Sequence, residues 1–249
     1  MGLKLDFSKV QTPAALKTSL KGAAKSHSLR CDAKQAEPRF ARFDQFIRSV
    51  DNFCLGDYLP QAFVKGSQPI YLETIDPDGV PVISTLAIQR LRVVEDACRF
   101  VSRESFDAID SVRKPKANDV LLTLDGGTSI GKPVLFDLED EYAIDSHVAI
   151  LRPDNLDPRL LVYLLASPLG QVQFQQAESG ASGQTAVTEE DVRRFRFPVI
   201  APSQVAKIVS DFEAARSAML KLEEQLKKAE GAAWDKFNRA LVSSGKSAR

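Results

Sequence analysis

The sequence predicts an α+β fold, in which a domain with a mixed or antiparallel sheet is followed by a long C-terminal coiled-coil helix. Short β-prone runs bounded by Pro and Gly recur between residues 51 and 203 with few helical stretches between them. This spacing favours an antiparallel or mixed sheet over a doubly wound one. From residue 204 to 241, apolar residues instead alternate at spacings of three and four, which predicts a helix that pairs with another helix.

The composition is that of an ordinary globular protein, with 44% hydrophobic and 27% charged residues among 249. It excludes wholesale disorder and a collagen-like architecture. No apolar run reaches the roughly 18 residues of a membrane span, so we expect a soluble, cytoplasmic chain without a membrane partner. The 33 basic and 33 acidic residues balance, which excludes a chain that is basic throughout; nucleic-acid binding would need local patches.

The first 50 residues form a separate N-terminal segment with helical character. They carry ten Lys/Arg against four acidic residues, a net charge of +6. We expect an amphipathic helix that packs on the domain, because apolar groups recur at helical spacing in this segment. The apolar groups are Phe40, Phe43, Phe46 and Ile47, after Pro38.

Residues 51–203 form the predicted domain. The expected strands are PIYLETI, VPVISTLAI, LRVV, CRFVS, DVLLTL, KPVLFDL, YAIDSHVAIL and RFRFPVIAP. One helix is expected over LDPRLLVYLLASPLGQVQF, with Asp157 as its N-cap and Pro158 at its first position. Thr188 is expected to cap a further helix, with Glu190 and Asp191 in the first turn.

The C-terminal segment 204–241 is predicted to be a spacer and dimerisation helix about 57 Å long. Such a length exceeds what one domain needs to close its core, so we expect the helix to project and to pair. The alternative is a single helix lying along the domain. Residues 242–249 are expected to be a disordered tail. The helix-pairing interface is predicted at Val205, Ile208, Phe212, Met219, Leu222 and Leu226.

Cysteine and histidine are too sparse for most site chemistry. Cys31, Cys54 and Cys98 lack the paired spacing of a zinc or redox motif, so buried or idle thiols are expected. His147 lies in an alternating run where a backbone group is its expected partner, and His27 lies in a polar basic stretch. We therefore expect no catalytic residue, no metal site and no cofactor.

A glycine-rich segment, GGTSIGKP at residues 126–133, partly matches a phosphate-binding loop. The match fails at Pro133, which offers no hydroxyl for magnesium, and the residues that follow are strand-like rather than helical. Two interpretations remain open. The segment is either a structural turn or a loop that presents backbone N–H groups with Thr128, Ser129 and Lys132 to an anion such as a DNA phosphate.

A second small-residue loop, ESGASGQTAVTEEDV, covers residues 178–192. Gln can bond both edge atoms of adenine, and Ser or Thr suits phosphates, so Ser182, Gln184 and Thr185 are candidates for DNA contact. The alternative is a solvated connection. In the run AIQRLRV, strand alternation places Arg90 and Arg92 on one face. This face would either line a DNA backbone or be the solvent-exposed side of a sheet.

The order of these segments resembles the specificity (S) subunit of type I restriction–modification systems. The resemblance covers nearly all of residues 28–241. It rests on SLRCDAKQAEPRF (28–40), CLGDYLPQAF (54–63), KANDVLLTLDGGTSIGKPVLF (116–136), and LRPDNLDPRLLVYLLASPLGQVQFQQAESGASGQTAVTEEDVRRFRFPVIAPSQVAKIVSDF (151–212) running into the long helix.

The resemblance implies a non-catalytic subunit whose target recognition domain, at 51–203, reads one half of a split DNA sequence. It implies double-stranded DNA, adenine methyltransferase (M) subunits and a restriction (R) subunit as partners. It also implies secondary DNA-contact candidates in the variable part of the domain. These are Thr74, Ser84, Arg90 and Arg92.

One departure concerns length, since family members usually carry two recognition domains and two spacer helices. We hypothesise a half-subunit that forms a homodimer through residues 204–241 and so reads a palindromic bipartite site. A truncated gene product and the recognition component of another methylation-based defence system remain open. The competing function is a non-DNA α+β adaptor that assembles a complex through its long helix; an enzyme built on the glycine-rich loop is the third.

Overall fold

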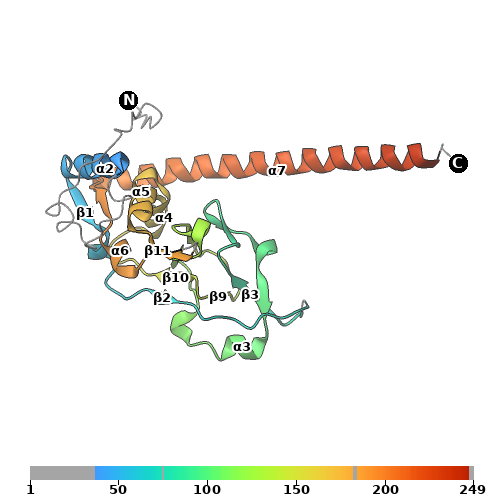
Figure 1. The fold of residues 1–249 in the computed structure, drawn as a ribbon, viewed down its shortest axis with the longest axis horizontal. Helices are drawn as coiled ribbons and strands as arrows, with labels where there is room; N and C mark the ends of the chain where they lie inside the picture. Colours follow the sequence, from blue (N-terminus) through green and yellow to red (C-terminus); the bar gives the residue numbers. More distant parts are fainter. Residues whose placement is uncertain (1–36, 75, 182–183, 247–249) are drawn as a thin grey trace. The chain divides into compact units, whose positions relative to one another are not determined.

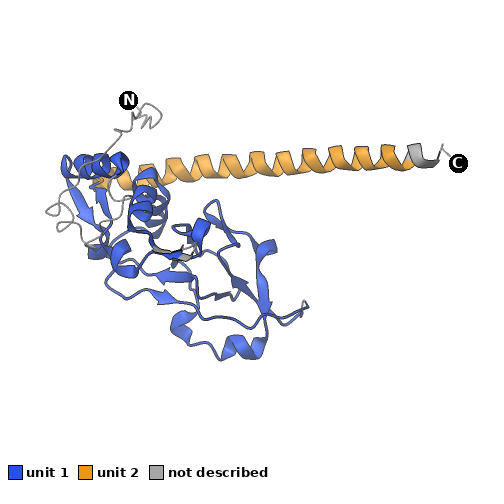
Figure 2. Ribbon diagram, in the orientation of Figure 1, with its two compact units in different colours: residues 1–199 blue, residues 200–249 orange. Residues whose placement is uncertain are grey.

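The computed structural model describes residues 37–74, 76–181 and 184–246 (Figure 1). The chain divides into two compact units, residues 1–199 and 200–249 (Figure 2). The first unit combines helices with largely antiparallel sheets, and the second is one long helix. The predicted α+β class is therefore confirmed. Cys31 and His27 lie outside the described residues.

The central sheet of the first unit has four antiparallel strands in the order β2-β10-β7-β8. Every residue of β7 and β10 is buried, as expected for central strands covered on both faces. The strands are β2 (Val64–Lys65), β10 (Val148–Leu151), β7 (Val120–Thr123) and β8 (Pro133–Leu135).

A second sheet has the order β6-β3-β9, with β3 antiparallel to β6 and parallel to β9. Ile83 and Ile144 from this sheet pack in one apolar cluster with Leu121 and Ile150 of the central sheet. The two sheets thus share a core. The strands are β6 (Arg99–Val101), β3 (Val80–Ile83) and β9 (Ala143–Ile144).

Three strand pairs stand outside these sheets, and each is antiparallel. β1 pairs with β13, which brings the start of the domain against its end. The other two are local hairpins. The pairs are β1 (Asn52–Cys54) with β13 (Arg196–Pro198), β4 (Ile88–Gln89) with β5 (Arg92–Val93), and β11 (Ser179–Ala181) with β12 (Gln184–Ala186).

Helices cover the sheet and the strand pair β1–β13. α4 contacts β7 and β8, α5 contacts α4 and α2, and α2 contacts β13. The amphipathic helix expected near Pro38 is α2, which buries Phe40, Phe43 and Ile47. The helices of this unit are α2 (Pro38–Arg48), α3 (Arg103–Asp107), α4 (Pro158–Ala166), α5 (Pro168–Ala177) and α6 (Glu189–Arg193).

The single helix expected over residues 157–174 is instead the pair α4 and α5. Pro168 has no backbone N–H and disfavours a helical conformation in the residue before it, so α4 ends at Ala166. Ser167 then caps α5 by accepting a hydrogen bond from the Gly170 N–H at 3.2 Å. The predicted cap at Asp157 is confirmed, since its carboxylate accepts from the Arg159 N–H at 2.8 Å.

Three expected strands also differ from the prediction. VPVISTLAI is divided between β3 and β4, because a turn closed by the Ala87 N–H and the Ser84 carbonyl interrupts it. YAIDSHVAIL is not one strand but two, β9 and β10, because a turn closed by the Val148 N–H and the Asp145 carbonyl sends them into different sheets. PIYLETI forms no strand over its described residues 69–74. The Leu72 N–H donates to the Phe100 carbonyl, but Pro69 has no N–H to extend such a ladder.

α7 (Pro202–Lys246) is a continuous helix of 45 residues, about 68 Å long at 1.5 Å per residue. Figure 1 shows it without a kink. The helix includes Val242 and the four residues after it, which the sequence assigned to a disordered tail; residues 247–249 lie outside the described part. No helix among the described residues is long and apolar enough to cross a membrane.

Candidate nucleic-acid interface

The glycine-rich segment forms a closed loop tied at its base by Thr123, the last residue of β7. The Thr123 hydroxyl accepts a hydrogen bond from the Lys132 N–H at 2.9 Å and donates one to the Ser129 carbonyl. The Thr123 carbonyl accepts from the Gly131 N–H at 2.9 Å. Because Thr123 is fully buried, these bonds fix the loop from beneath.

Glycine is required at the positions where this loop reverses. Gly126 and Gly131 have φ angles of +106° and +76°, which side chains of L-residues rarely adopt. A Cβ atom on Gly131 would also lie 2.8 Å from the ring of Phe174. The glycines therefore allow the loop to take this conformation.

The three candidates in this loop differ in access. Thr128 is exposed, Lys132 is half-buried and Ser129 is buried. The Lys132 Nζ donates to the Ser129 Oγ at 3.3 Å. Of these two hydroxyls, that of Thr128 meets solvent, whereas that of Ser129 is buried and accepts the hydrogen bond from Lys132.

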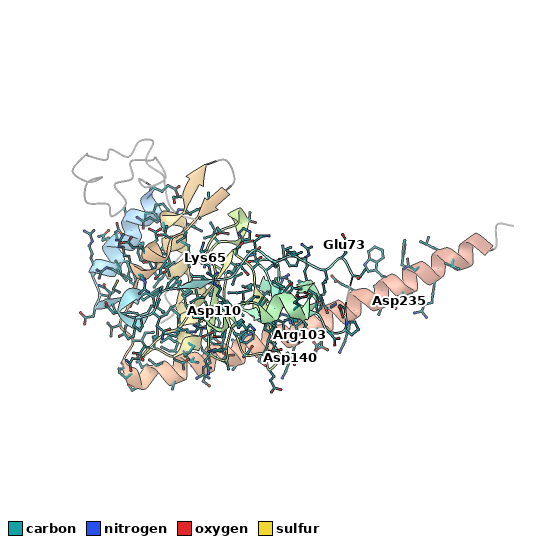
Figure 3. All side chains as sticks on the ribbon, turned by 90° about the horizontal axis from the view of Figure 1, so that it is seen from below. Lys65, Glu73, Arg103, Asp110, Asp140 and Asp235 are labelled. Carbon is teal, nitrogen blue, oxygen red and sulfur yellow. The ribbon has the colours of Figure 1, made fainter. Side chains whose placement is uncertain are left out.

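The second candidate loop is the hairpin β11–β12, and it lies against the first. Asp125 forms an isolated antiparallel bridge with Ala186, and the Val187 N–H donates to the Leu124 carbonyl at 2.8 Å. The two loops are 60 residues apart in sequence, and the fold brings them together. Figure 3 shows the hairpin standing out from the rest of the domain.

Within this hairpin the Thr185 hydroxyl donates to Glu178 at 2.5 Å. Gln184 pairs with Ala181 through the backbone, whereas Ser182 lies outside the described residues. The predicted cap that follows is confirmed, because Thr188 and Asp191 form a reciprocal capping box at the start of α6.

A third loop, residues 84–87 between β3 and β4, reaches the glycine-rich loop from the end of β3. A Cβ atom on Gly126 would lie 3.9 Å from the Thr85 Cγ2. Ser84 is half-buried, and its hydroxyl accepts from the Leu86 N–H at 3.3 Å. Ser84 therefore holds this turn in shape, while Thr85, which the sequence did not single out, lies closer to the glycines.

Arg90 and Arg92 do not share a strand face as predicted. β4 ends at Gln89 and β5 begins at Arg92, so Arg90 and Leu91 form a two-residue turn with φ angles of +49° and +61°. Such a turn normally takes Asn or Gly, because both central residues need positive φ. Alternation failed here because the chain reverses inside the run; both arginines are exposed.

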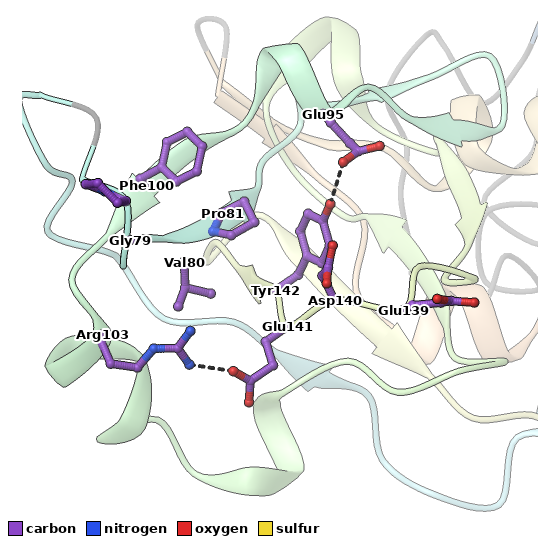
Figure 4. Close-up of a pocket in the computed structure, with 11 residues that line it drawn as sticks. Gly79, Val80, Pro81, Glu95, Phe100, Arg103, Glu139, Asp140, Glu141 and Tyr142 are labelled. Atoms are coloured by element: carbon purple, nitrogen blue, oxygen red, sulfur yellow. Dashed lines mark hydrogen bonds and ion pairs between the residues drawn. The ribbon is translucent and has the colours of Figure 1, made fainter.

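Thr74, the remaining candidate, lies in a different place. It lines a groove with Glu73, Glu95 and Asp96. A neighbouring groove of about 510 Å³ shares Glu95 with the first and adds Glu139, Asp140 and Glu141 (Figure 4). No pattern in the sequence indicates that Thr74 is separated from the other candidates.

This acidic groove lies at the amino-terminal ends of β3 and β9, since Gly79, Val80 and Tyr142 line it. Arg103 forms an ion pair with Glu141, and the Tyr142 hydroxyl donates to Glu95 at 3.0 Å (Figure 4). Burial is the main cause that raises the pKa of Tyr142, and the hydrogen bond to Glu95 raises it further. The groove's net charge is negative, which is unfavourable for phosphate.

Charged groups at the opposite ends of these strands were not found from the sequence. Asp125 contacts the imidazole Nδ1 of His147 and lies 3.4 Å from the Lys65 Nζ. The prediction of a backbone partner for the His147 ring was wrong, because the ring contacts the Asp125 carboxylate. This partner was missed because it lies 22 residues away in sequence. The Asp145 carboxylate accepts a hydrogen bond from the backbone N–H of His147 at 2.9 Å, and burial raises the pKa of Asp145.

The structure describes two of the three thiols. Cys98 is buried, and burial raises its pKa to about 11; the half-buried Cys54 donates to the Arg193 carbonyl at 3.1 Å. Among the described residues, no three His, Cys, Asp or Glu side chains are grouped as a metal site.

Solved structures with a similar fold come from type I restriction–modification (R-M) systems. The S subunit from M. genitalium has a TM-score of 0.49 at 13% identity, covering 70% of this chain and 41% of its own. The HsdS subunit from Thermoanaerobacter tengcongensis has a TM-score of 0.48 at 16% identity, covering 82% and 49%. A structure from work on complex assembly and conformational transition of the type I R-M system has a TM-score of 0.47 at 19% identity, covering 87% and 55%.

The chain is thus similar to specificity subunits. These are the proteins that the order of its sequence motifs resembles, and the chain spans about half the length of the three similar chains, from 41% to 55%. No protein-family model and no curated protein sequence matches it.

Proposed function

We propose that this chain is the sequence-specific DNA-recognition subunit of a type I restriction–modification complex. It reads one half of a bipartite site with residues 51–203 and docks methyltransferase subunits, which carry the chemistry. The chain itself is not an enzyme and acts in the cytoplasm. A restriction subunit joins the same complex through these partners.

The observation that carries this proposal is the convergence of the candidate loops. The bridge between Asp125 and Ala186 joins the glycine-rich loop to the hairpin β11–β12, and Thr85 brings the third loop against Gly126. Three polar loops at one end of a rigid sheet form a surface that can follow a DNA groove and contact its backbone. A purely structural turn would need no such neighbours.

The second half of the site requires a second recognition domain, which we propose is another copy of the chain bound through α7. Large apolar side chains lie exposed along this helix, from 42% for Ile208 to 63% for Leu222, and they continue beyond the predicted interface to Trp234, Phe237 and Leu241. The Trp234 and Phe237 rings contact each other edge to face at 5.7 Å. Such a surface favours a protein partner.

The apolar seam of α7 keeps a strict heptad from Val205 to Ala233. On an undistorted α-helix such a seam drifts by about 20° per repeat, or about 80° over these four repeats. A partner helix that follows the seam therefore coils around α7 in a left-handed supercoil.

Side-chain size along the seam favours an antiparallel partner. If Met219 lies opposite Leu222 of a second copy, the bulky residues Ile208, Phe212 and Leu226 each meet a small one in the neighbouring layers, which fills space as a packed core does. Val205 then lies opposite Lys236 at the end of the paired segment. Arg216 then faces Glu223 across the pair. The large-to-small layers are Ile208 with Ala233, Phe212 with Ala229, and Leu226 with Ala215.

The recognition role is tested by reconstituting the chain with a type I adenine methyltransferase subunit and mapping methylated adenines on a plasmid library. We expect one bipartite, palindromic target. Methylation of a single half-site would remove the dimer from the proposal. Failure of the complex to bind or methylate DNA, with the subunits still associated, would instead support the adaptor function.

The helix pairing is tested by cross-linking. In the antiparallel register, a mixture of Met219→Cys and Leu222→Cys chains forms a disulfide dimer more readily than either variant alone. A parallel pair gives the reverse result, and wild type controls for the native cysteines. Light scattering that shows a monomer, both alone and with the methyltransferase, would contradict the dimer.

A further inference from the structure

An ammonium, a carboxylate and an imidazole meet at one end of the strands of the central sheet, between the two candidate loops. Lys65 ends β2, Asp125 follows β7 by two residues and His147 directly precedes β10. Ala149 of β10 pairs with Lys65 on one side and with Leu122 on the other. The three side chains therefore come from adjoining strand ends and not from a mobile segment.

Asp125 is the centre of this group. One carboxylate oxygen contacts the His147 Nδ1, and the other lies 3.4 Å from the Lys65 Nζ. The Asp125 backbone connects the two loops, because Asp125 directly precedes Gly126 and forms a β-bridge with Ala186 of the hairpin. The base of the group is tied by the Leu124 N–H, which donates to the His147 carbonyl at 3.1 Å.

The acidic side chains of this group are more buried than the basic ones. The Asp125 side chain is 24% exposed, whereas those of Lys65 and His147 are each 50% exposed. Asp145, the other acid beside His147, is only 5% exposed. The carboxylates thus lie beneath and the basic groups above them. Arg113 adds a further cation at the same strand end, donating to the Lys65 carbonyl at 3.1 Å.

We propose that Lys65 and His147 bind a phosphate of the DNA backbone and that Asp125 is the positioning residue that holds both. Because the His147 Nδ1 contacts Asp125, Nε2 is the ring nitrogen that can face a ligand. A carboxylate that bonds one ring nitrogen orients the other in the same way in metal-binding histidines. A flexible ammonium and one ring nitrogen suit a point anion better than a base edge, which is read by paired donors and acceptors.

This inference rests on the proposed function and adds a phosphate site between the glycine-rich loop and the hairpin. Lys132 lies in the first of these loops, where it is the candidate for a second phosphate contact. Asp125 then has a second effect. Its negative charge weakens non-specific attraction to DNA, while its hydrogen bond keeps the imidazole in place.

The experiment uses the full chain in complex with its methyltransferase, at about pH 6, where histidine carries substantial positive charge. Binding of cognate and unrelated duplexes is measured as a function of salt. We expect Lys65→Ala and His147→Gln each to weaken both duplexes equally and to lower the slope of log affinity against log salt by about one. The double variant should lower it by about two.

Asp125→Asn gives a result of opposite sign. The amide oxygen still accepts a hydrogen bond, but the negative charge is lost, so affinity for the unrelated duplex should rise about two- to five-fold. A purely structural role predicts an equal or lower affinity. The matched control is Arg103→Gln, which removes one cation at the acidic groove and should leave the slope unchanged.

Unchanged slopes for Lys65→Ala and His147→Gln, in a complex that binds its cognate duplex, would overturn the phosphate site and leave the proposed function standing. A wild-type complex that binds neither duplex would overturn the proposed function itself. Urea unfolding of each variant identifies any loss that comes from misfolding. In that case Lys65→Gln, which keeps most of the stem, replaces Lys65→Ala in the same measurement.

Discussion

The two ends of strands β3 and β9 differ in charge and in shape. At their amino-terminal ends lies an open acidic groove, in which the cation Arg103 is paired with Glu141. At their carboxy-terminal ends lie the three polar loops, with Lys65 and His147 above buried or half-buried acids. Figure 3 shows Lys65 well apart from Arg103 and Asp140.

This difference would allow a chain with no net charge to bind a polyanion, as the proposed function requires. β3 has four residues, or about 13 Å at 3.3 Å per residue, which exceeds the Debye length of about 8 Å at physiological salt. The acids of the groove are therefore largely screened from a phosphate at the other end. Charge balance over the whole sequence says little about either surface.

The largest expected effect comes from disturbing the loop end itself. Gly131→Ala places a methyl group 2.8 Å from the Phe174 ring at a φ of +76°, and we expect a loss of about 2–4 kcal/mol in the free energy of unfolding. Urea denaturation measures it. Gly231→Ala is the control, because that position is open and alanine favours helix; equal losses in both variants would contradict the packing argument.

Next in size is the effect on base reading. Gln184→Ala should relax selection at one base pair of the half-site, by about 1–3 kcal/mol of discrimination, and leave the other positions unchanged. Methylation mapping measures this. Gln175→Ala, on the surface of α5 where Gln175 accepts from Arg39, is the control. If sequence selection is unchanged, Gln184 does not read a base.

A smaller effect is expected for Lys132→Ala. Its ammonium lies 3.3 Å from the Ser129 hydroxyl, and as a phosphate contact it should weaken all sequences alike and lower the salt slope by about one. Fluorescence anisotropy at several salt concentrations measures both quantities. Lys228→Ala, which removes a cation paired with Glu224 on α7, should not change the slope; a sequence-dependent loss for Lys132→Ala would assign it to base reading instead.

The smallest effect is expected at the acidic end. Removing two charges with Glu139→Gln and Asp140→Asn should change DNA affinity less than about two-fold at physiological salt, because of screening over that distance. The same anisotropy assay applies. A gain larger than that of Asp125→Asn would show that DNA approaches the groove, and the contrast between the two ends would then be wrong.

Local signals in the sequence predicted the parts of the fold that depend on near neighbours. Asp157 and Thr188 cap helices as expected, because capping involves residues two or three positions away. The seam in α7 was also predicted from spacing alone. The break at Ser167 was missed, although Pro168 signals it, because the apolar pattern continues across it.

The candidate site could be predicted only in part. Thr128 and Lys132 were found because glycines mark their loop. The contact of His147 with Asp125 depends on the pairing of β7 with β10, which no linear pattern shows. The turn at Arg90 was missed because neither Arg90 nor Leu91 is a residue typical of positive φ.

The pairing of β1 with β13 has a consequence for how this domain changes over time. Asn52 lies opposite Pro198 and Cys54 opposite Arg196, so the chain enters and leaves residues 55–195 through one short two-stranded stem. A different domain joined at the same stem would leave α2 and α7 with their own sequences. Recombination at these two points would therefore exchange the proposed DNA-reading surface as one unit and leave α7, the proposed pairing helix, unaltered.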